Sequence, residues 1–309
     1  MTESKLKHDD IPQPTDESRL HLYLAWACPF CHRVLAALTL TGLIERVSIT
    51  WMQNIKGPAG WGIAPGNDPL FAETSMKRVY ERLEPGADHR PSVPLLVDLS
   101  SQKRLSSSSS QITRFLARGM NGAYSVNHDL APASFIEKID TMNAWLHDNV
   151  NRAVYAVGFA AEQRVYEDKV ARLFQSLDKL DSRLTDQPFL FGATITESDL
   201  YLLATLVRFD TIYYPLFRCS YRRIVDYPGL SAYFQRLLEI DGITSTYDHA
   251  LNKQHYFCSV MHVGGEIMDF NPSRLVPVDS QMYDGSISVP SKWQAHERQA
   301  GLAPDTTDG

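Results

Sequence analysis

The sequence predicts an α/β domain followed by an all-helical domain. Short strand-like runs alternate with helical periodicity up to about residue 119, whereas only helical periodicity recurs from residue 134 onward. A cysteine motif, Cys28-Pro29-Phe30-Cys31, stands where the first strand-like run ends and the first helix begins. The expected organisation is a polar N-terminal tail at 1–18, the α/β domain at 19–119, a linker at 120–133, the helical domain at 134–262 and an extended tail at 263–309.

The first strand is expected at 20–24 and the first helix from Pro29 to a stop at Gly42. Pro29 suits the first helical position because its missing N–H would have no partner there. Cys28 then lies at the helix N-terminus, where free amides and the helix dipole favour a thiolate, and nearby Arg33 is expected to add to this effect. Cys31 is expected to be shielded but within reach of Cys28, so the two thiols can act as a redox pair.

Two other interpretations of the cysteine motif stay open. A zinc site would need a second pair of ligands, but Cys219 and Cys258 are isolated, so we expect no metal. Two buried structural cysteines are more credible, since free cysteine is often buried. A proline between the strand end and the helix favours an exposed first sulfur instead.

The other elements of the first domain follow from the same patterns: a parallel strand at 47–51, a long ordered loop at 54–69, a helix at 76–83, a strand at 92–98 and its hairpin partner at 103–106. Pro94 marks an edge or a turn, and a cis Val93-Pro94 bond would leave the amide and carbonyl of Val93 free for a ligand backbone. The serines at 106–110 are expected to cap the next helix. This order of elements is the thioredoxin-like layout.

The second half of the chain reads as helices only. Apolar periodicity predicts them at 136–146, 165–184, 200–207 and 230–238, with another short element at 251–261. Thr196-Glu197-Ser198-Asp199 resembles a capping box ahead of the third of these helices.

The composition is typical of a soluble globular protein: 309 residues, 44% hydrophobic, 21% charged, with a formal net charge of -6. The mild acidity and the lack of a dense basic stripe argue against nucleic-acid binding. No apolar run reaches membrane-spanning length, and residues 1–19 have no apolar signal-peptide core. We therefore expect a cytoplasmic protein without a membrane partner, in which four cysteines stay reduced.

Several short motifs carry a family resemblance over about residues 19–261. They are Leu22-Tyr23, Ala27-Cys28-Pro29, His32-Arg33, Gly60-Trp61, Asp68-Pro69-Leu70, Ser92-Val93-Pro94, Val154-Tyr155, Gly158-Phe159-Ala160, Thr196-Glu197-Ser198-Asp199, Leu206-Val207-Arg208-Phe209-Asp210, Asp226-Tyr227-Pro228 and Lys253-Gln254-His255-Tyr256. With them the chain resembles the cytosolic glutathione transferases, and most closely the Xi class, the glutathionyl-hydroquinone reductases. Together these motifs are specific, although each alone is weak.

The resemblance implies that glutathione is the co-substrate and that Cys28 takes it up as a mixed disulfide. Val93, before the matching cis-proline Pro94, would pair with the glutathione backbone, and Trp61 would lie against the tripeptide. Ser109 would hold the γ-glutamyl carboxylate at a helix N-terminus. The family resemblance also implies a homodimer.

Tyr155 and Tyr256 match tyrosines that face the acceptor pocket in that class, where a hydroxyl can polarise a ring oxygen. The commoner fate of such tyrosines is packing with a satisfied hydroxyl.

The sequence departs from the Xi pattern at two positions. Cys31 stands where the class has alanine, which makes the motif closer to that of glutaredoxins. Ser108 stands where the class has a glutamate that receives the γ-glutamyl ammonium. Losing that charge-assisted hydrogen bond would cost about 1.5 to 3 kcal/mol, or roughly ten- to a hundredfold in glutathione affinity.

Three functions therefore follow from the sequence. The first is a glutathione-dependent thiol reductase that removes glutathione from small aromatic, quinone-derived conjugates. The second is a glutaredoxin-like dithiol oxidoreductase that uses Cys28 and Cys31. The third is a non-catalytic ligand-binding homologue, which retention on glutathione-agarose would separate from the other two.

Overall fold

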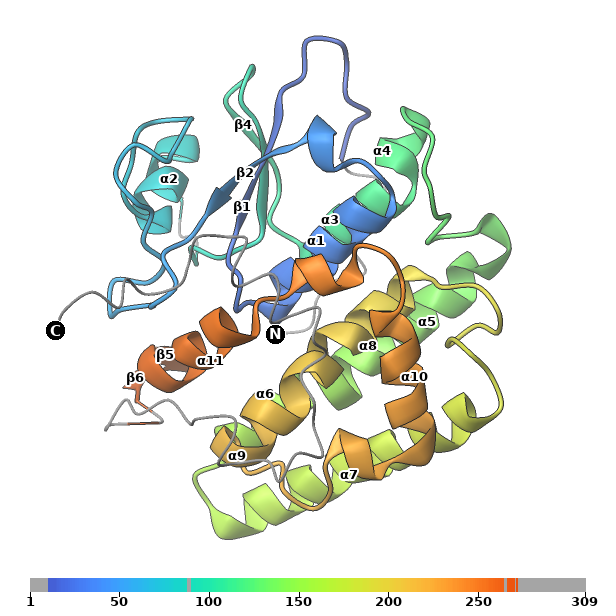
Figure 1. Cartoon of the computed structure of the whole chain (residues 1–309). Coiled ribbons are helices and arrows are strands. Elements are labelled where there is room, and N and C mark those ends of the chain that lie inside the picture. The colour runs from blue at the N-terminus through green and yellow to red at the C-terminus, as the bar shows by residue number, and fades with distance from the viewer. Residues whose placement is uncertain (1–10, 88–89, 264–265, 270, 272–309) are drawn as a thin grey trace, which may run out of the picture.

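The computed structural model describes residues 11–87, 90–263, 266–269 and 271. A small sheet with its helices occupies one half of the molecule, and a cluster of helices occupies the other (Figure 1). This confirms the predicted order of an α/β domain and an all-helical domain.

The sheet has four strands in the order β2-β1-β3-β4. They are β1 (Leu20–Leu24), β2 (Ser48–Trp51), β3 (Leu95–Asp98) and β4 (Lys103–Ser106). β1 and β2 are parallel, and β3 runs antiparallel to both β1 and β4, as a thioredoxin-like layout requires.

The third strand is shorter than its predicted range of 92–98 and begins at Leu95, after a cis Val93-Pro94 bond. Because β3 lies inside the sheet, Pro94 marks a turn and not an edge. A proline there has no N–H to donate to a ladder, so pairing starts only after it.

Three helices cover this sheet: α1 (Pro29–Leu40), α2 (Met76–Leu83) and α3 (Ser109–Ala117). Figure 1 shows α1 and α3 on the side that faces the helical domain and α2 on the opposite side. The side chain of Ser75 caps α2 and that of Ser108 caps α3, each by accepting a backbone N–H bond, as expected for serine at these positions. α1 ends before Gly42, whose φ of 76° suits glycine.

The segments predicted as an N-terminal tail and a linker pack against the α/β domain. Ile11 is only 1% exposed, and its carbonyl accepts a 2.7 Å bond from the Asn121 side chain.

A 3-10 turn, η1 (Ile44–Arg46), leads into β2, and a kinked turn, α4 (Gly119–Gly122), follows α3. Residues 1–10 lie outside the described part of the chain.

The helical domain is centred on α8 (Glu197–Arg208), in which every residue is buried. Its predicted capping box is confirmed, since the Thr196 and Asp199 side chains satisfy each other's backbone amides. The other elements are η2 (Ala133–Phe135), α5 (Ile136–Leu146), η3 (His147–Asn151), α6 (Ala153–Gly158), α7 (Gln163–Thr185), η4 (Phe209–Tyr213), α9 (Tyr214–Leu216), η5 (Ile224–Asp226), α10 (Pro228–Leu238), η6 (Ile243–Thr246) and α11 (His249–Cys258).

One expectation for this half of the chain was wrong, because it does not consist of helices only. β5 (Met261–Val263) and β6 (Glu266–Met268) pair as a small antiparallel hairpin across the predicted start of the extended tail. The sequence signal was the pair of glycines at 264–265, a typical hairpin connection. The rest of the predicted tail, 272–309, lies outside the described residues.

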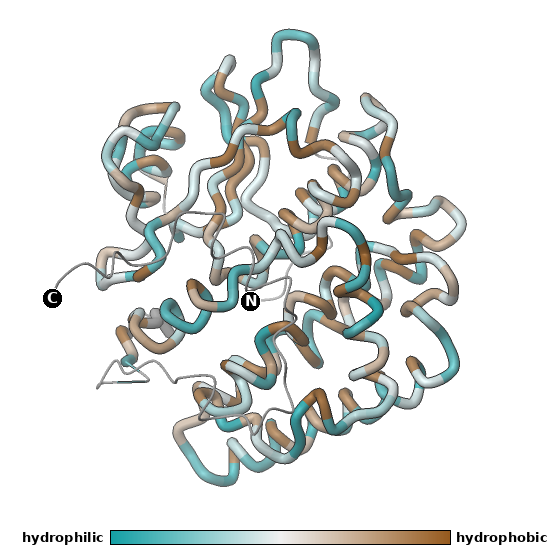
Figure 2. The backbone as a smooth tube through the Cα atoms, in the orientation of Figure 1, coloured by the Kyte–Doolittle hydropathy of each residue, from teal (hydrophilic) through white to brown (hydrophobic). Residues whose placement is uncertain are grey.

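Hydrophobic residues run along the strands and the helices next to them, while the outlying loops are more polar (Figure 2). Buried side chains from both halves form one continuous core cluster. No helix within the described ranges is long and apolar enough to cross a membrane.

Candidate active site

Cys28 is the N-cap residue of α1, directly after the turn that follows β1. Its backbone is extended, and Pro29 occupies the first helical position as predicted. The thiol is partly exposed, and its sulfur lies 3.7 Å from the carbonyl oxygen of Val93. The structure therefore places Cys28 between the N-terminus of a helix and the loop that contains the cis-proline.

The surroundings of Cys28 lower the pKa of its thiol to about 7. The largest cause is a hydrogen bond from the Cys31 thiol; burial opposes it, and the backbone amides of Cys31 and Phe30 and the charge of Arg208 add to the lowering. Burial and the neighbouring sulfur raise the pKa of Cys31 well above its ordinary value. The two thiols thus interact with each other and differ in acidity.

Arg33 is not among the groups that lower the pKa of Cys28. One Nη of Arg33 donates to the Ser109 hydroxyl, and the guanidinium lies 3.8 Å from the centre of the Tyr201 ring. A cation that does lower the pKa of Cys28 is Arg208, at the C-terminal end of α8. Helical spacing placed Arg33 near the cysteine in sequence, but the packing of α1 against α3 and α8 decides where its side chain points.

The cis Val93-Pro94 peptide leaves Val93 outside the sheet ladder, with its carbonyl towards the Cys28 sulfur. Trp61, in the loop after β2, stacks on His255 of α11 at 5.1 Å between ring centres. The ammonium of Lys56 lies 5.4 Å from the Trp61 ring, and burial, together with Arg90, lowers its pKa, while Cys28 acts in the opposite direction. Lys56 and Trp61 thus border the same site as Cys28.

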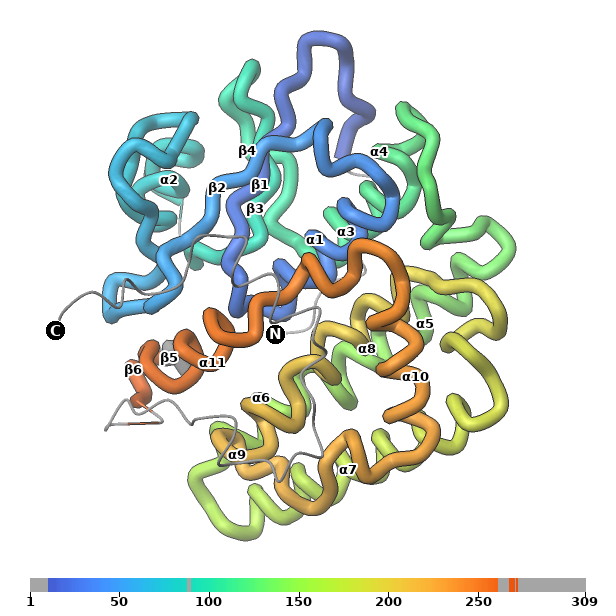
Figure 3. Tube along the Cα trace, viewed as in Figure 1, coloured from blue at the N-terminus to red at the C-terminus, as the bar shows by residue number. Residues whose placement is uncertain are grey.

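Helix α11 holds this loop in place. The Asn54 side chain donates to the backbone oxygen of Leu251 at 3.0 Å, and the Asn54 carbonyl lies 2.6 Å from Nδ1 of His255. The Lys56 amide donates to the Ser259 hydroxyl at 2.8 Å. Figure 3 shows α11, in orange, alongside the blue loop that follows β2, so one wall of the site comes from the C-terminal part of the chain.

The N-terminus of α3 carries the two serines expected to meet the γ-glutamyl group. The Ser108 hydroxyl accepts from the Gln111 amide at 3.4 Å and lies 2.8 Å from the Ser110 hydroxyl. Ser109 is buried in the first turn, where its hydroxyl accepts from Arg33. Ser108 therefore acts as a helix cap here, which a glutamate does less well.

Three tyrosines from three helical segments meet on the other side of Cys28. The hydroxyl of Tyr155 on α6 lies 2.6 Å from that of Tyr256 on α11, and Tyr213 on η4 lies 3.2 Å from Tyr256. Tyr213 and Tyr256 are buried, while Tyr155 is partly exposed. Burial raises the pKa of all three, and the Cys28 charge contributes to this for Tyr155 and Tyr256. All three hydroxyls therefore keep their protons at neutral pH.

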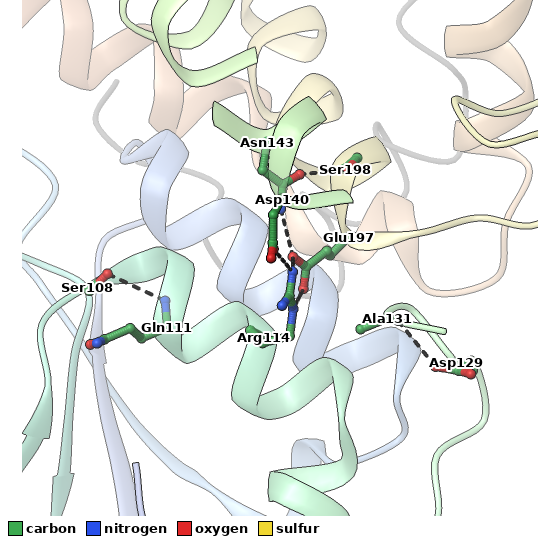
Figure 4. A network of polar contacts seen from close by, with 9 residues as sticks. All are labelled: Ser108, Gln111, Arg114, Asp129, Ala131, Asp140, Asn143, Glu197 and Ser198. Atoms are coloured by element: carbon green, nitrogen blue, oxygen red, sulfur yellow. Dashed lines mark hydrogen bonds and ion pairs between the residues drawn. The ribbon is translucent and has the colours of Figure 1, made fainter. Parts of the chain in front are cut away.

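A buried ion pair fixes the α/β domain against the helical domain (Figure 4). Two nitrogens of Arg114 on α3 donate to the two carboxylate oxygens of Glu197 on α8, at 2.9 and 2.6 Å. Arg114 also pairs with Asp140 at 2.7 Å, and the Asn143 side chain donates to Glu197 at 2.7 Å. The walls of the site, which come from both domains, are positioned by this cluster.

Sequence reasoning missed Tyr213, Arg208, Lys56 and His255 as parts of the site. Arg208 and His255 lie inside two of the motifs that carried the family resemblance. The sequence therefore singled out both residues, but it did not indicate what either of them does. Tyr213 and Lys56 lie in stretches without any motif, and only the fold brings them to the site.

A thioredoxin-like domain that presents a cysteine at a helix N-terminus, followed by an all-helical domain, defines the architecture of glutathione-dependent thiol enzymes. Comparison with known proteins agrees. Residues 163–236 match the family model described as "Glutathione S-transferase, C-terminal domain". The chain is 35% identical over 267 residues to glutathionyl-hydroquinone reductase PcpF of Sphingobium chlorophenolicum, an alignment that covers 85% of this chain and 83% of PcpF.

Solved structures give the same result. Glutathione transferase Xi 1 from Trametes versicolor is 35% identical, with a TM-score of 0.76 over 84% of this chain and 91% of that one. The glutathione-bound structure of YqjG from Escherichia coli K-12 is 31% identical, with a TM-score of 0.78 over 87% of this chain and 89% of that one. The chain belongs to the Xi class of glutathione transferases, the glutathionyl-hydroquinone reductases. It is a glutathione-dependent enzyme, with glutathione as its co-substrate.

Proposed function

We propose that this enzyme removes glutathione from quinone-derived aromatic conjugates through a mixed disulfide on Cys28. The observation that carries the proposal is a half-buried cysteine, with a thiol pKa of about 7, whose charge acts on the protonated hydroxyls of Tyr155 and Tyr256. A thiolate is the attacking species in exchange at sulfur, and a phenolic hydroxyl suits the oxygen of a quinone-type ring. The similarity to PcpF, a glutathionyl-hydroquinone reductase, supports the same assignment.

The reaction balances in two steps. The Cys28 thiolate attacks the sulfur of the conjugate, a sulfur–sulfur bond forms, the bond from sulfur to the aryl carbon breaks, and that carbon takes the electron pair and a proton. The thiolate of a second glutathione then attacks the glutathionyl sulfur on Cys28, which forms oxidised glutathione and releases the Cys28 thiolate. Two glutathione sulfurs are thus oxidised to a disulfide while the aryl carbon is reduced.

Tyr155 is the hydroxyl we assign to the ring oxygen, because it is the partly exposed member of the tyrosine cluster. Its contact with Tyr256 at 2.6 Å orients it, and the Tyr213 hydroxyl lies 3.2 Å from that of Tyr256 and 3.5 Å from that of Tyr155. A preorganised hydroxyl of this kind stabilises charge that develops on the ring oxygen as the carbon–sulfur bond breaks.

For glutathione we propose a backbone pairing at Val93, a contact with Trp61 and a carboxylate site at the N-terminus of α3 near Ser109. Support comes from the Val93 carbonyl, which lies outside the sheet ladder and beside the Cys28 sulfur. The N-terminal amides of α3 suit a carboxylate. Ser108 provides no charge for the γ-glutamyl ammonium, so we expect weaker glutathione binding than a glutamate at this position would give.

A second candidate function has its own supporting observation. The Cys28 and Cys31 thiols lie close enough to shift each other's pKa in opposite directions, and both are free thiols. A dithiol route, in which Cys31 resolves the mixed disulfide on Cys28 and acts on protein or small-molecule disulfides, is therefore compatible with the geometry.

Mass spectrometry after incubation with oxidised glutathione, followed by turnover of a glutathionyl-hydroquinone conjugate, tests both functions. A glutathione adduct on Cys28 together with conjugate turnover supports the reductase, whereas an internal Cys28–Cys31 disulfide without conjugate turnover supports the dithiol route. Wild-type turnover in Cys28→Ser would overturn both.

We also infer a homodimer from the family resemblance and a cytoplasmic location from the sequence pattern described above. Light scattering coupled to size-exclusion chromatography tests the first, and fractionation of the source cells tests the second. A monomer at micromolar concentration or enrichment in a membrane fraction would contradict the corresponding inference.

A further inference from the structure

We propose that Arg208 is a positioning residue for Cys28, whose buried guanidinium holds the turn ahead of the cysteine and acts as the counter-ion of its thiolate. The inference rests on the proposed function, in which Cys28 attacks as a thiolate. It concerns the state of the thiol before any substrate arrives, so it is tested separately from turnover.

Arg208 reaches from α8 in the helical domain to the backbone of the α/β domain. Its side chain is 0% exposed. Nε donates to the carbonyl of Ala27 and one Nη to that of Trp26, each at 3.2 Å, while the other Nη donates to Ala204 at 2.8 Å. Trp26 and Ala27 are the two residues directly before Cys28, so the guanidinium fixes the turn that sets the position of the sulfur.

The partners of this guanidinium are uncharged. Within the described ranges, no carboxylate lies in ion-pair contact with Arg208, whereas the buried Arg114 has two. The Nδ1 atom of His32 lies 3.1 Å from Nη1 of Arg208 and Nε2 of His32 lies 2.9 Å from the Thr246 hydroxyl. Burial first, and then Arg208, lower the pKa of His32 well below its usual range, so this ring is neutral and accepts from Arg208.

Burying a cation without a neighbouring anion raises the free energy of the folded protein, and an anion nearby lowers it again. The Cys28 thiolate is a group that can supply the negative charge, because it follows the two carbonyls that Arg208 holds. The other titratable groups that act on or respond to Cys28 are Cys31 on α1, Tyr155 on α6, Tyr256 on α11 and Lys56 in the loop after β2. Cys31 and the tyrosines stay neutral at pH 7, so they do not replace the charge of Arg208. Lys56 is a second basic group on which the Cys28 charge acts, but it is only half-buried and, in the part of the chain that the structure describes, donates no bond to the turn before Cys28.

Arg33 offers a matched comparison. It is also a buried arginine, 4% exposed, and has no ion pair with a carboxylate among the residues that the structure describes. Its hydrogen bond goes to Ser109, however, its cation lies over the Tyr201 and Phe30 rings, and it is not among the groups that lower the pKa of Cys28. Comparing variants of the two arginines therefore separates the effect of losing any buried guanidinium from the specific effect of losing Arg208.

The test is the rate of iodoacetamide alkylation of Cys28 as a function of pH, followed by mass spectrometry of the peptide that contains it. Full-length wild type, Arg208→Met, Arg208→Lys and Arg33→Met are compared, with circular dichroism and thermal unfolding to check each fold. We expect a wild-type midpoint near 7. Arg208→Met should raise the midpoint by about one unit, because an opposite charge that acts on the thiolate is lost.

Arg208→Lys should keep the midpoint near that of wild type, since its charge remains, and Arg33→Met should leave the midpoint unchanged. A folded Arg208→Met with the wild-type midpoint overturns the proposal. If Arg208→Met does not fold, the Arg208→Lys variant tests the proposal instead. A midpoint about one unit above that of wild type in Arg208→Lys overturns the charge argument, and a wild-type midpoint supports it. An equal rise in Arg33→Met would also overturn it. These outcomes do not depend on which conjugate the enzyme reduces.

Discussion

The hydroxyl oxygens of Tyr155 on α6 and Tyr256 on α11 lie 2.6 Å apart. The pair joins two helices that are about a hundred residues apart in the chain, and only Tyr155 is partly exposed. A hydroxyl that is held by a second buried hydroxyl has little freedom to rotate, which is the property needed to stabilise charge on a substrate oxygen.

Removing the Tyr155 hydroxyl should therefore slow the reductive step. We expect Tyr155→Phe to lower kcat for a glutathionyl-hydroquinone conjugate by about a hundredfold and to leave formation of the Cys28 adduct from oxidised glutathione unchanged. Tyr213→Phe is the matched control, since its hydroxyl is buried, 3.5 Å from that of Tyr155 and 3.2 Å from that of Tyr256, and its effect should be clearly smaller. Equal losses in the two variants would contradict the role given to Tyr155.

The reactivity of Cys28 should follow the ionisation of its thiol. Its pKa lies below the ordinary value, at about 7, so the reactive thiolate is lost as the pH falls through 7 and is present above it. The alkylation rate of Cys28 should rise with pH through this range and level off well before the range of an ordinary thiol. The pKa of a free cysteine is about 8.5. A midpoint above that value would show that the helix N-terminus and Cys31 do not activate the Cys28 thiol.

Cys31 should affect both the acidity and the resolution of Cys28. The Cys31 thiol makes the largest contribution to the lowered pKa of Cys28, so Cys31→Ala should raise that pKa towards its ordinary value. If the dithiol route operates, the variant should also accumulate a stable Cys28–glutathione adduct and lose disulfide reductase activity. Reduction of conjugates at high pH should survive, since free glutathione resolves the adduct. Undiminished disulfide reduction would remove the support for that route.

Ser108→Glu should strengthen glutathione binding. A carboxylate at the head of α3 can accept from the γ-glutamyl ammonium, and one charge-assisted hydrogen bond corresponds to roughly tenfold in affinity or more. Calorimetry measures the change, and Ser107→Glu, one residue earlier, is the control for added negative charge. The same or weaker binding in Ser108→Glu would mean that another group already holds the ammonium or that this is not the γ-glutamyl site.

Loss of Glu197 should destabilise the protein far more than loss of Asp140. Glu197 is 1% exposed and pairs with Arg114, which is 2% exposed, so Glu197→Ala leaves a buried charge with one partner fewer and should cost about 3 to 5 kcal/mol. The Asp140 side chain is 39% exposed, and Asp140→Ala should cost about 1 kcal/mol or less. Urea unfolding of both variants checks the order, and equal midpoints would contradict it.

Local chemistry made much of this protein predictable from its sequence. The strand 20–24, the helix 76–83 and the capping box at Thr196 and Asp199 were predicted correctly, because alternation, helical spacing and side-chain capping act between near neighbours. The position of Cys28 was predictable for the same reason, since a proline at the first helical position defines the helix N-terminus.

Tertiary structure alone decided which distant side chains share the site. Nothing local distinguishes Arg33, which turns to Ser109, from Arg208, which reaches the backbone before Cys28 from another domain. Tyr213 likewise joins the tyrosine cluster only because η4 and α11 pack together. Contacts between residues far apart in the chain depend on how whole elements pack, and periodicity along the sequence carries no information about that packing.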